Sequence, residues 1–180
     1  MPAKKQITKE MILNAALRIL QEQGYEAVNI KRLATALGCS TQPVYLSFSG
    51  MDELRSALIP LTVAEFEAYM QRSGASSLYD MPYIQFAKEE PRLFCFLFMR
   101  ANAFAEIRQA LVPMIERSIA ALMAAYHISH AEADWLHDQL WMHAHGIAAM
   151  IATNFCDWNM EKAQAMLAES SRAFTGKYEA

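Results

Sequence analysis

The sequence predicts an all-α protein. Glycine and proline number only six each in 180 residues, and the turn clusters that separate the strands of a sandwich or barrel are missing. Apolar residues recur at helical spacing along most of the chain, without an internal repeat or low-complexity tract. We expect an N-terminal three-helix helix-turn-helix head followed by a larger helical domain, with about nine helices in total.

The first helix is expected to begin after Thr8, which can serve as its N-cap, and to reach about Glu22. Its apolar stripe runs from Ile12 to Leu20 at helical spacing, so that one face is buried. Gly24 ends this helix.

Residues 29–48 contain two short helix patterns separated by a glycine turn. Asn29 can cap the first helix, and Gly38 supplies the left-handed residue that ends it. Ser40 is expected to cap the second helix, and Pro43 lies in that helix's first turn, where its missing N–H removes no helical hydrogen bond. This arrangement is typical of a helix-turn-helix, whose second helix enters the major groove of DNA.

Polar side chains on that second helix are the candidates for contacts to bases and phosphates. Tyr45 either contacts DNA or packs its ring on the turn, and Lys31 with Arg32 either contact phosphates or solvate their helix. Lys4 and Lys5 either enter the minor groove as an arm or form a solvated tail. The predicted DNA-binding residues are Lys4, Lys5, Lys31, Arg32, Ser40, Thr41, Gln42, Tyr45 and Ser47.

The net charge of −3 hides an uneven distribution. Residues 1–55 carry seven basic and five acidic residues, whereas the remainder carries nine basic and fourteen acidic residues. The basic part of the chain therefore coincides with the helix-turn-helix, as contact with DNA requires.

A further helix is expected to begin at Asp52 and Glu53, whose charges suit a helix N-terminus, and to be bent by Pro60. We place the domain boundary here, with a helix-turn-helix domain over residues 1–50 and a second domain over residues 51–180. The later helices are expected at residues 78–88, 91–102, 105–126, 131–155 and 160–174.

Several classes of protein are disfavoured by what the sequence lacks. No apolar run reaches the length of a bilayer span, and the N-terminus does not resemble a signal peptide, so we expect a cytoplasmic protein without a membrane partner. The three cysteines lack CxxC spacing and are interpreted as reduced thiols. No catalytic motif or dinucleotide fingerprint is present, so neither enzymatic activity nor a cofactor is expected.

The order of these parts resembles the TetR family of one-component transcriptional regulators. An apolar first helix, a capped second helix and a short third helix stand in the family's order at the N-terminus. The residues that carry the resemblance are Gly24-Tyr25, Asn29, Gly38-Cys39-Ser40, Tyr45, Phe48 and Leu54. Two departures stand out: Met51 replaces a lysine that commonly contacts phosphate, and Gln42-Pro43 replace a common Gly-Thr. Without this lysine, DNA binding should release about one counterion fewer, so the affinity should fall less steeply with salt concentration.

The resemblance implies a homodimer on a palindromic double-stranded DNA operator, paired through a four-helix bundle of the last two helices of each subunit. The apolar residues of residues 131–174 then form the interface, or alternatively an internal core. The predicted interface residues are Trp135, Leu136, Leu140, Ile147, Ile151, Ala163, Met166, Leu167 and Phe174.

Rings are concentrated between Tyr79 and Phe104, where they either line a pocket for an apolar or aromatic effector or form an ordinary helical core. The candidate ligand-binding residues are Tyr83, Phe86, Phe98, Met99, Arg100, Asn102 and His143. The five histidines near Asp134 and Asp138 lack metal-ligand spacing, so we expect no metal site and interpret them as solvated or interface side chains.

The sequence therefore predicts a ligand-responsive transcriptional regulator that binds DNA as a homodimer and is released by a small, apolar or aromatic effector; the family resemblance implies a repressor. The high apolar content of 54% agrees with a chain that needs a subunit interface or an apolar pocket. The alternative is a helical protein that binds or sequesters a small molecule and carries a vestigial DNA-binding head.

Overall fold

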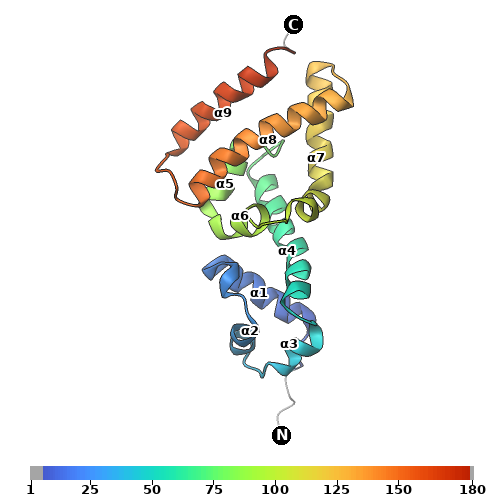
Figure 1. The fold of residues 1–180 in the computed structure, drawn as a ribbon, viewed down its shortest axis with the longest axis vertical. Coiled ribbons are helices and arrows are strands. Elements are labelled where there is room, and N and C mark those ends of the chain that lie inside the picture. Colours follow the sequence, from blue (N-terminus) through green and yellow to red (C-terminus); the bar gives the residue numbers. More distant parts are fainter. Residues whose placement is uncertain (1–5, 179–180) are drawn as a thin grey trace. The chain divides into compact units, whose positions relative to one another are not determined.

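The computed structural model describes residues 6–178, and within this range the chain is helical without a strand. Figure 1 shows the helices in chain order. The predicted all-α class with nine α-helices is confirmed. The elements are α1 (Lys9–Gln23), the 3₁₀ turn η1 (Tyr25–Ala27), α2 (Ile30–Leu37), α3 (Gln42–Ser47), α4 (Met51–Arg72), α5 (Met81–Glu89), α6 (Pro91–Phe98), α7 (Phe104–Tyr126), α8 (His130–Ala152) and α9 (Met160–Thr175).

The chain divides into two compact units, an N-terminal unit over residues 1–65 and a C-terminal unit over residues 66–180. The division falls inside α4, whereas the sequence analysis placed a domain boundary ahead of this helix. Within residues 6–178, no helix combines the length and the apolar character that crossing a bilayer requires.

The predicted ends of α1 and α2 are confirmed. The Thr8 hydroxyl accepts a hydrogen bond from the backbone N–H of Met11 at 3.2 Å, and the Asn29 side chain accepts one from the N–H of Arg32 at 3.0 Å. Gly38 ends α2 with φ of 64°, in the left-handed region that favours glycine. Gly38 therefore lets the chain turn from α2 towards α3.

The expected Ser40 cap is wrong. The third helix begins at Gln42, its capping position is Thr41, and no side-chain hydrogen bond closes its first turn. Pro43 contributes to the difference, because it has no backbone N–H to donate to Ser40 from the position three residues later, where a capping oxygen often finds its donor.

The core of the N-terminal unit comes from one face of each short helix. The α1 stripe predicted between Ile12 and Leu20 is buried, and α2 adds Leu33 and Ala34. α1 packs against both α2 and α3. These helices are too short to be stable alone, so the apolar area that they bury against one another stabilises them.

The C-terminal unit is built around α8, against which α5, α6, α7 and α9 all pack. In Figure 1, α9 lies alongside α8. The Phe66, Tyr83 and Phe94 rings are fully buried in this unit, and the Tyr83 ring meets the other two edge to face, with centroids 6.0 Å from Phe66 and 5.7 Å from Phe94.

The helix expected from residue 78 begins three residues later. Asp80 receives the backbone N–H groups of Ser76 and Ser77 and the Ser76 hydroxyl, each at 2.8 Å. This carboxylate therefore closes the preceding turn, and α5 begins only after it, at Met81.

Candidate functional site

The N-terminal unit presents one face of α3 to solvent. Val44 and Phe48, four residues apart, are buried and hold the helix to the unit. Between them, Tyr45 is 60% exposed and Leu46 is 79% exposed. Large side chains that project from a short helix contribute little to the core, so they are available for contact with another molecule.

The predicted DNA-binding residues are unequally placed around α3. Ser40 and Gln42 are exposed and Thr41 is half-buried. Thr41 and Gln42 lie four and three residues before Tyr45, so they fall on the same side of the helix. The Ser47 hydroxyl instead donates to the carbonyl oxygen of Pro43 at 2.9 Å, within its own helix. Two further predicted positions, Lys4 and Lys5, lie outside the described residues.

The first turn of α2 carries two exposed cations. Lys31 and Arg32 both face solvent, and the Arg32 guanidinium donates to the Gln23 side chain. They are positioned on the surface of the N-terminal unit, where a phosphate group could reach them. The structure leaves their predicted role as phosphate contacts a prediction.

A polar cluster fixes the connection between α3 and α4. The Glu53 carboxylate accepts hydrogen bonds from the Ser49 N–H and hydroxyl, each at 2.8 Å, and from the Lys9 ammonium at 3.2 Å. These hydrogen bonds lower the pKa of Glu53 to about 2, and the two from Ser49 contribute most. The Lys9 ammonium also lies 4.6 Å from the centre of the Phe48 ring, so it supports the residue that anchors α3.

The sequence analysis missed Leu46, because it selected only polar positions on the presumed exposed face. The helical spacing did contain the signal, since Leu46 lies two residues from the buried Val44 and so on the other side of the helix. An exposed leucine can contact the methyl group of thymine, which makes this position a candidate for base discrimination.

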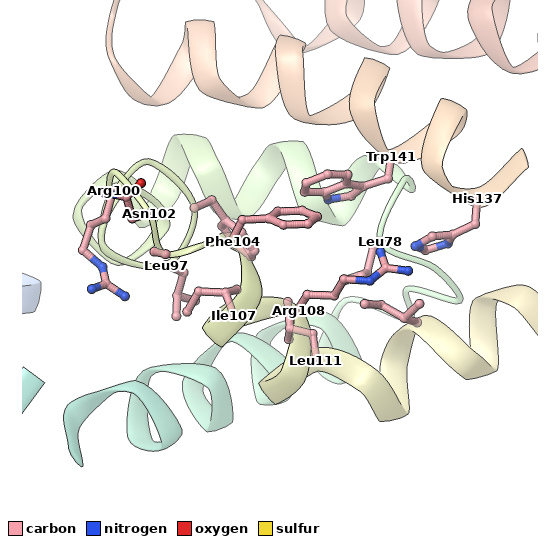
Figure 2. A pocket seen from close by; sticks show the side chains of 13 residues that line it. Leu78, Leu97, Arg100, Asn102, Phe104, Ile107, Arg108, Leu111, His137 and Trp141 are labelled. Carbon is pink, nitrogen blue, oxygen red and sulfur yellow. The ribbon is translucent and has the colours of Figure 1, made fainter. Parts of the chain in front are cut away.

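The C-terminal unit contains a cavity of about 130 Å³ bounded by α6, α7 and α8, by the residues between α6 and α7, and by Leu78 from the segment ahead of α5. Figure 2 shows Arg108 extending into it from α7, and His137 and Trp141 pointing toward it from α8. Its lining residues are Leu78, Leu97, Phe98, Arg100, Asn102, Ala103, Phe104, Ile107, Arg108, Leu111, Ile115, His137 and Trp141.

Two polar side chains stand at one end of this cavity. The Arg108 guanidinium lies 3.4 Å from a carboxylate oxygen of Asp134 and 3.4 Å from one of Asp138. His137 is 2% exposed, and its Nδ1 atom is buried without a hydrogen-bond partner. Burial lowers the pKa of His137, with smaller contributions from its charged neighbours. The sequence analysis expected a solvated or interface histidine here, but the ring is enclosed by the subunit itself.

Three of the predicted ligand-binding residues, Phe98, Arg100 and Asn102, line the cavity. The other predicted positions, Tyr83, Phe86, Met99 and His143, are not among its lining residues. The Tyr83 hydroxyl shares a hydrogen bond of 3.0 Å with Nδ1 of His145 in the aromatic core.

The remaining three of those positions have other surroundings. Phe86 is buried against the Phe66 ring, and Met99 is exposed. The His143 ring lies 6.3 Å from the ring of Phe174 on α9. The ring-rich stretch therefore supplies mainly the core and only part of the cavity wall.

Sequence reasoning missed Arg108, His137 and Trp141 as cavity residues, and it placed Phe104 in the ring-rich stretch without selecting it as a ligand-binding residue. Phe104 and Trp141, whose ring centres are 6.2 Å apart, come from different helices, so no local spacing brings them together. One signal was available: Arg108 interrupts an otherwise apolar stripe formed by Ile107 and Leu111 in α7.

The residues predicted for a subunit interface divide into two groups. Trp135 is 61% exposed, and three residues of α9 are half-buried, namely Met166, Leu167 and Phe174. The others are buried by the chain's own residues, which are Leu136, Leu140, Ile147, Ile151 and Ala163.

A different face of α8 is exposed and apolar. Met142 is 52% exposed and Met150 is also exposed, and both share the helical face of Trp135. We call Trp135, Met142 and Met150 the exposed stripe of α8; each of them keeps more than a third of its surface exposed, although the Cys156 Sγ atom lies 3.9 Å from the Met150 Sδ atom. Among the same residues, no group of three or more His, Cys, Asp or Glu side chains is arranged to hold a metal ion.

Comparisons with known proteins agree on the type of fold. The family model for bacterial regulatory proteins of the tetR family matches residues 12–58. An uncharacterized HTH-type transcriptional regulator of Mycobacterium tuberculosis is 25% identical over 169 residues, which span 87% of this chain and 74% of that relative.

A solved structure also resembles this chain. The crystal structure of the multidrug binding protein EbrR complexed with imidazole has a TM-score of 0.58 at 17% sequence identity. The match covers 92% of this chain and 96% of that one. At this identity the likeness supports the fold and carries nothing about the ligand.

Proposed function

We propose that this chain is a ligand-responsive repressor of the TetR family that binds a palindromic operator as a homodimer, because the tetR-family model matches residues 12–58 and the relative is an HTH-type transcriptional regulator. The observation that carries the proposal is the face of α3, where Tyr45 and Leu46 project into solvent while Val44 and Phe48 anchor the helix. A helix of this kind following a capped helix and a glycine turn suits insertion into a major groove.

The contacts to DNA divide by chemistry. Tyr45 and Thr41 offer hydroxyls for phosphates, and Gln42 offers a carboxamide that matches the edge of adenine. Leu46 offers an apolar contact to thymine, so it contributes to sequence preference rather than to overall charge-driven affinity. Lys31 and Arg32 supply the charge near the phosphate backbone.

Pairing of two subunits through α8 and α9 would present two copies of α3 to the operator. The exposed stripe of Trp135, Met142 and Met150 supports this proposal, since a continuous apolar stripe on a long helix is costly to leave in water. Two half-sites about one helical turn, roughly 34 Å, apart would then be read together.

The cavity of the C-terminal unit is the proposed effector site. An effector releases DNA only if it binds the DNA-free conformation more tightly than the DNA-bound one. α4 belongs to both units, so it is the segment through which a change around the cavity would reach the reading helix. A coupling free energy of about 1 to 3 kcal/mol would alter operator affinity by roughly 5- to 150-fold.

A mobility-shift titration with the DNA upstream of the protein's own gene tests the DNA-binding part. We expect a discrete complex with the wild-type chain, and loss of that complex in the Tyr45→Ala and Leu46→Ala double variant. Met99→Ala, which removes an exposed apolar side chain of the C-terminal unit, is the matched control and should bind as the wild type does.

Equal DNA binding by the double variant and the wild type would overturn the proposed role of α3. The alternative function, a small-molecule carrier with a vestigial head, predicts no sequence-dependent complex from any of the three folded proteins. Circular dichroism of each variant verifies that the helices are intact.

A further inference from the structure

The size of the cavity limits its occupant. At about 130 Å³ it is slightly smaller than a cavity of about 150 Å³ that accepts one benzene molecule in another protein. The rings of Phe98, Phe104 and Trp141 form part of its wall, and rings of this kind favour stacked or edge contacts with a flat aromatic ligand. The cavity as a whole therefore suits no ligand larger than a single aromatic ring with one small substituent.

The polar lining of the cavity is rich in hydrogen-bond donors and lacks acids. Among the described residues, the charged or amide side chains that line it are Arg100, Asn102 and Arg108, and no carboxylate is among its lining residues. A cationic ligand would have no opposite charge to contact there, whereas an anionic ligand would meet a guanidinium.

Asp134 and Asp138 orient the Arg108 guanidinium but leave some of its N–H donors without a hydrogen bond. Its two nitrogen-to-oxygen distances to Asp134 and Asp138 are 3.4 Å, longer than the roughly 2.8 Å of strong charge-assisted hydrogen bonds. A guanidinium has five N–H donors, so two long bonds leave donors for a ligand. Neither carboxylate lines the cavity, and both therefore hold the guanidinium from outside it.

His137 gives a second, independent indication of a ligand. Its ring lines the cavity and is almost fully enclosed, yet its Nδ1 atom has no partner. A buried polar atom without a hydrogen bond carries an unfavourable desolvation cost, which an oxygen atom of a ligand would relieve. Figure 2 shows the His137 ring and the Arg108 guanidinium at the same end of the cavity.

We propose that the effector is a single-ring aromatic carboxylate, with its ring against Phe104 and Trp141 and its carboxylate bonded to Arg108 and His137. This inference rests on the proposed function, because it assigns a chemical class to the effector of the proposed repressor.

The proposed chemical class of the effector can be tested by calorimetric titration of the full chain, without DNA, with three ligands of similar shape. Benzoate, benzamide and benzamidine share a ring and a planar substituent, but the substituent is anionic, neutral or cationic. We expect benzoate to bind roughly tenfold more tightly than benzamide, since hydrogen bonds to a charged group are stronger, and benzamidine to bind weakest. Equal binding of all three probes, or tightest binding of benzamidine, would overturn the proposal.

Substitutions locate the binding in the cavity. His137→Phe and Arg108→Gln should each weaken benzoate binding, and His143→Phe is the matched control for the first. His143 lies on the same helix with a buried, unpartnered Nε2 atom, but it does not line the cavity. Equal losses of benzoate affinity in His137→Phe and His143→Phe would contradict the placement of benzoate in the cavity.

Asp138→Asn removes one negative charge next to Arg108 and leaves the cavity wall unchanged. We expect it to tighten benzoate binding, so it tests the charge preference even if Arg108→Gln fails to fold. Weaker benzoate binding in Asp138→Asn would contradict an anionic ligand.

The two proposals fail separately. If benzoate binds the cavity but does not displace DNA in the mobility-shift assay, the ligand class stands and ligand-responsive repression fails. If DNA is displaced by other compounds while benzoate does not bind, the proposed regulator stands and the ligand class fails.

Discussion

Tyr83 and His145 form a polar pair within the aromatic core of the C-terminal unit. The Tyr83 ring is fully buried, and its hydroxyl shares a 3.0 Å hydrogen bond with the His145 ring. Burial lowers the pKa of His145 and raises that of Tyr83, so both groups are kept neutral near pH 7. The pair is therefore a structural element of the core.

Tyr83→Phe should destabilise the protein by about 1 to 3 kcal/mol, because it leaves the His145 nitrogen without its partner in a partly buried position. Tyr69→Phe is the matched control, since its hydroxyl bonds to the exposed Glu89, and it should change the free energy of unfolding by less than about 0.5 kcal/mol. Urea unfolding at pH 7 measures both. Equal effects of the two substitutions would mean that the buried pair contributes nothing particular.

At the residue scale, the sequence predicted the caps of α1 and α2 but only three of the residues that line the cavity. Thr8, Asn29 and Gly38 act within a few residues of their own positions, so the local pattern contains the whole interaction. His137 and Arg108 meet only because α7 and α8 pack together, and that contact depends on the tertiary fold.

At the scale of elements, the joint between α3 and α4 depends on a single carboxylate. Glu53 receives the Ser49 N–H and hydroxyl and the Lys9 ammonium, and its pKa is lowered from 4.5 to about 2. A carboxylate whose pKa is lower in the folded state than in the unfolded state stabilises the fold above the unfolded pKa. This contribution is lost as the pH falls from about 4.5 towards 2.

Glu53→Gln should therefore lower the stability at pH 7 and reduce its loss between pH 4.5 and pH 2.5. Glu22→Gln, which removes an exposed charge from α1 of the same unit, should leave the pH dependence as in the wild type. Thermal unfolding followed by circular dichroism at several pH values checks this. A Glu53→Gln protein with the wild-type acid profile would show that these hydrogen bonds do not form in solution.

The helices themselves could be predicted from apolar spacing, but some of their ends could not. α3 and α5 begin later than expected, for two local reasons. Pro43 has no N–H to donate to Ser40, and the Asp80 carboxylate accepts its hydrogen bonds from Ser76 and Ser77, which precede it. Both are competitions between neighbouring groups for the same hydrogen bonds, which hydrophobic periodicity does not describe.

At the scale of the whole molecule, the proposed dimer depends on the face of α8 that carries Trp135, Met142 and Met150. The sequence analysis selected several residues of the opposite face, among them Leu136 and Leu140, which the chain's own core buries. Periodicity shows that a helix has an apolar face but does not tell whether the same subunit or a second one covers it.

Met142→Glu should raise the dissociation constant of the dimer by roughly a hundredfold or more, about 3 kcal/mol, because a charge would have to be buried against an apolar surface. Val112→Glu, at an exposed apolar position of α7, should leave the association unchanged. Sedimentation velocity over a range of protein concentrations distinguishes the two. A wild-type protein that remains monomeric at all concentrations would refute the proposed pairing.

Hydroxyl-radical footprinting of the wild-type protein on its upstream DNA tests most directly that two copies of α3 read one operator. We expect two protected segments of related, inverted sequence with centres about one helical turn, roughly 34 Å, apart, and no protection by the Tyr45→Ala and Leu46→Ala double variant. A single protected segment, or the same protection by the folded double variant, would contradict the account.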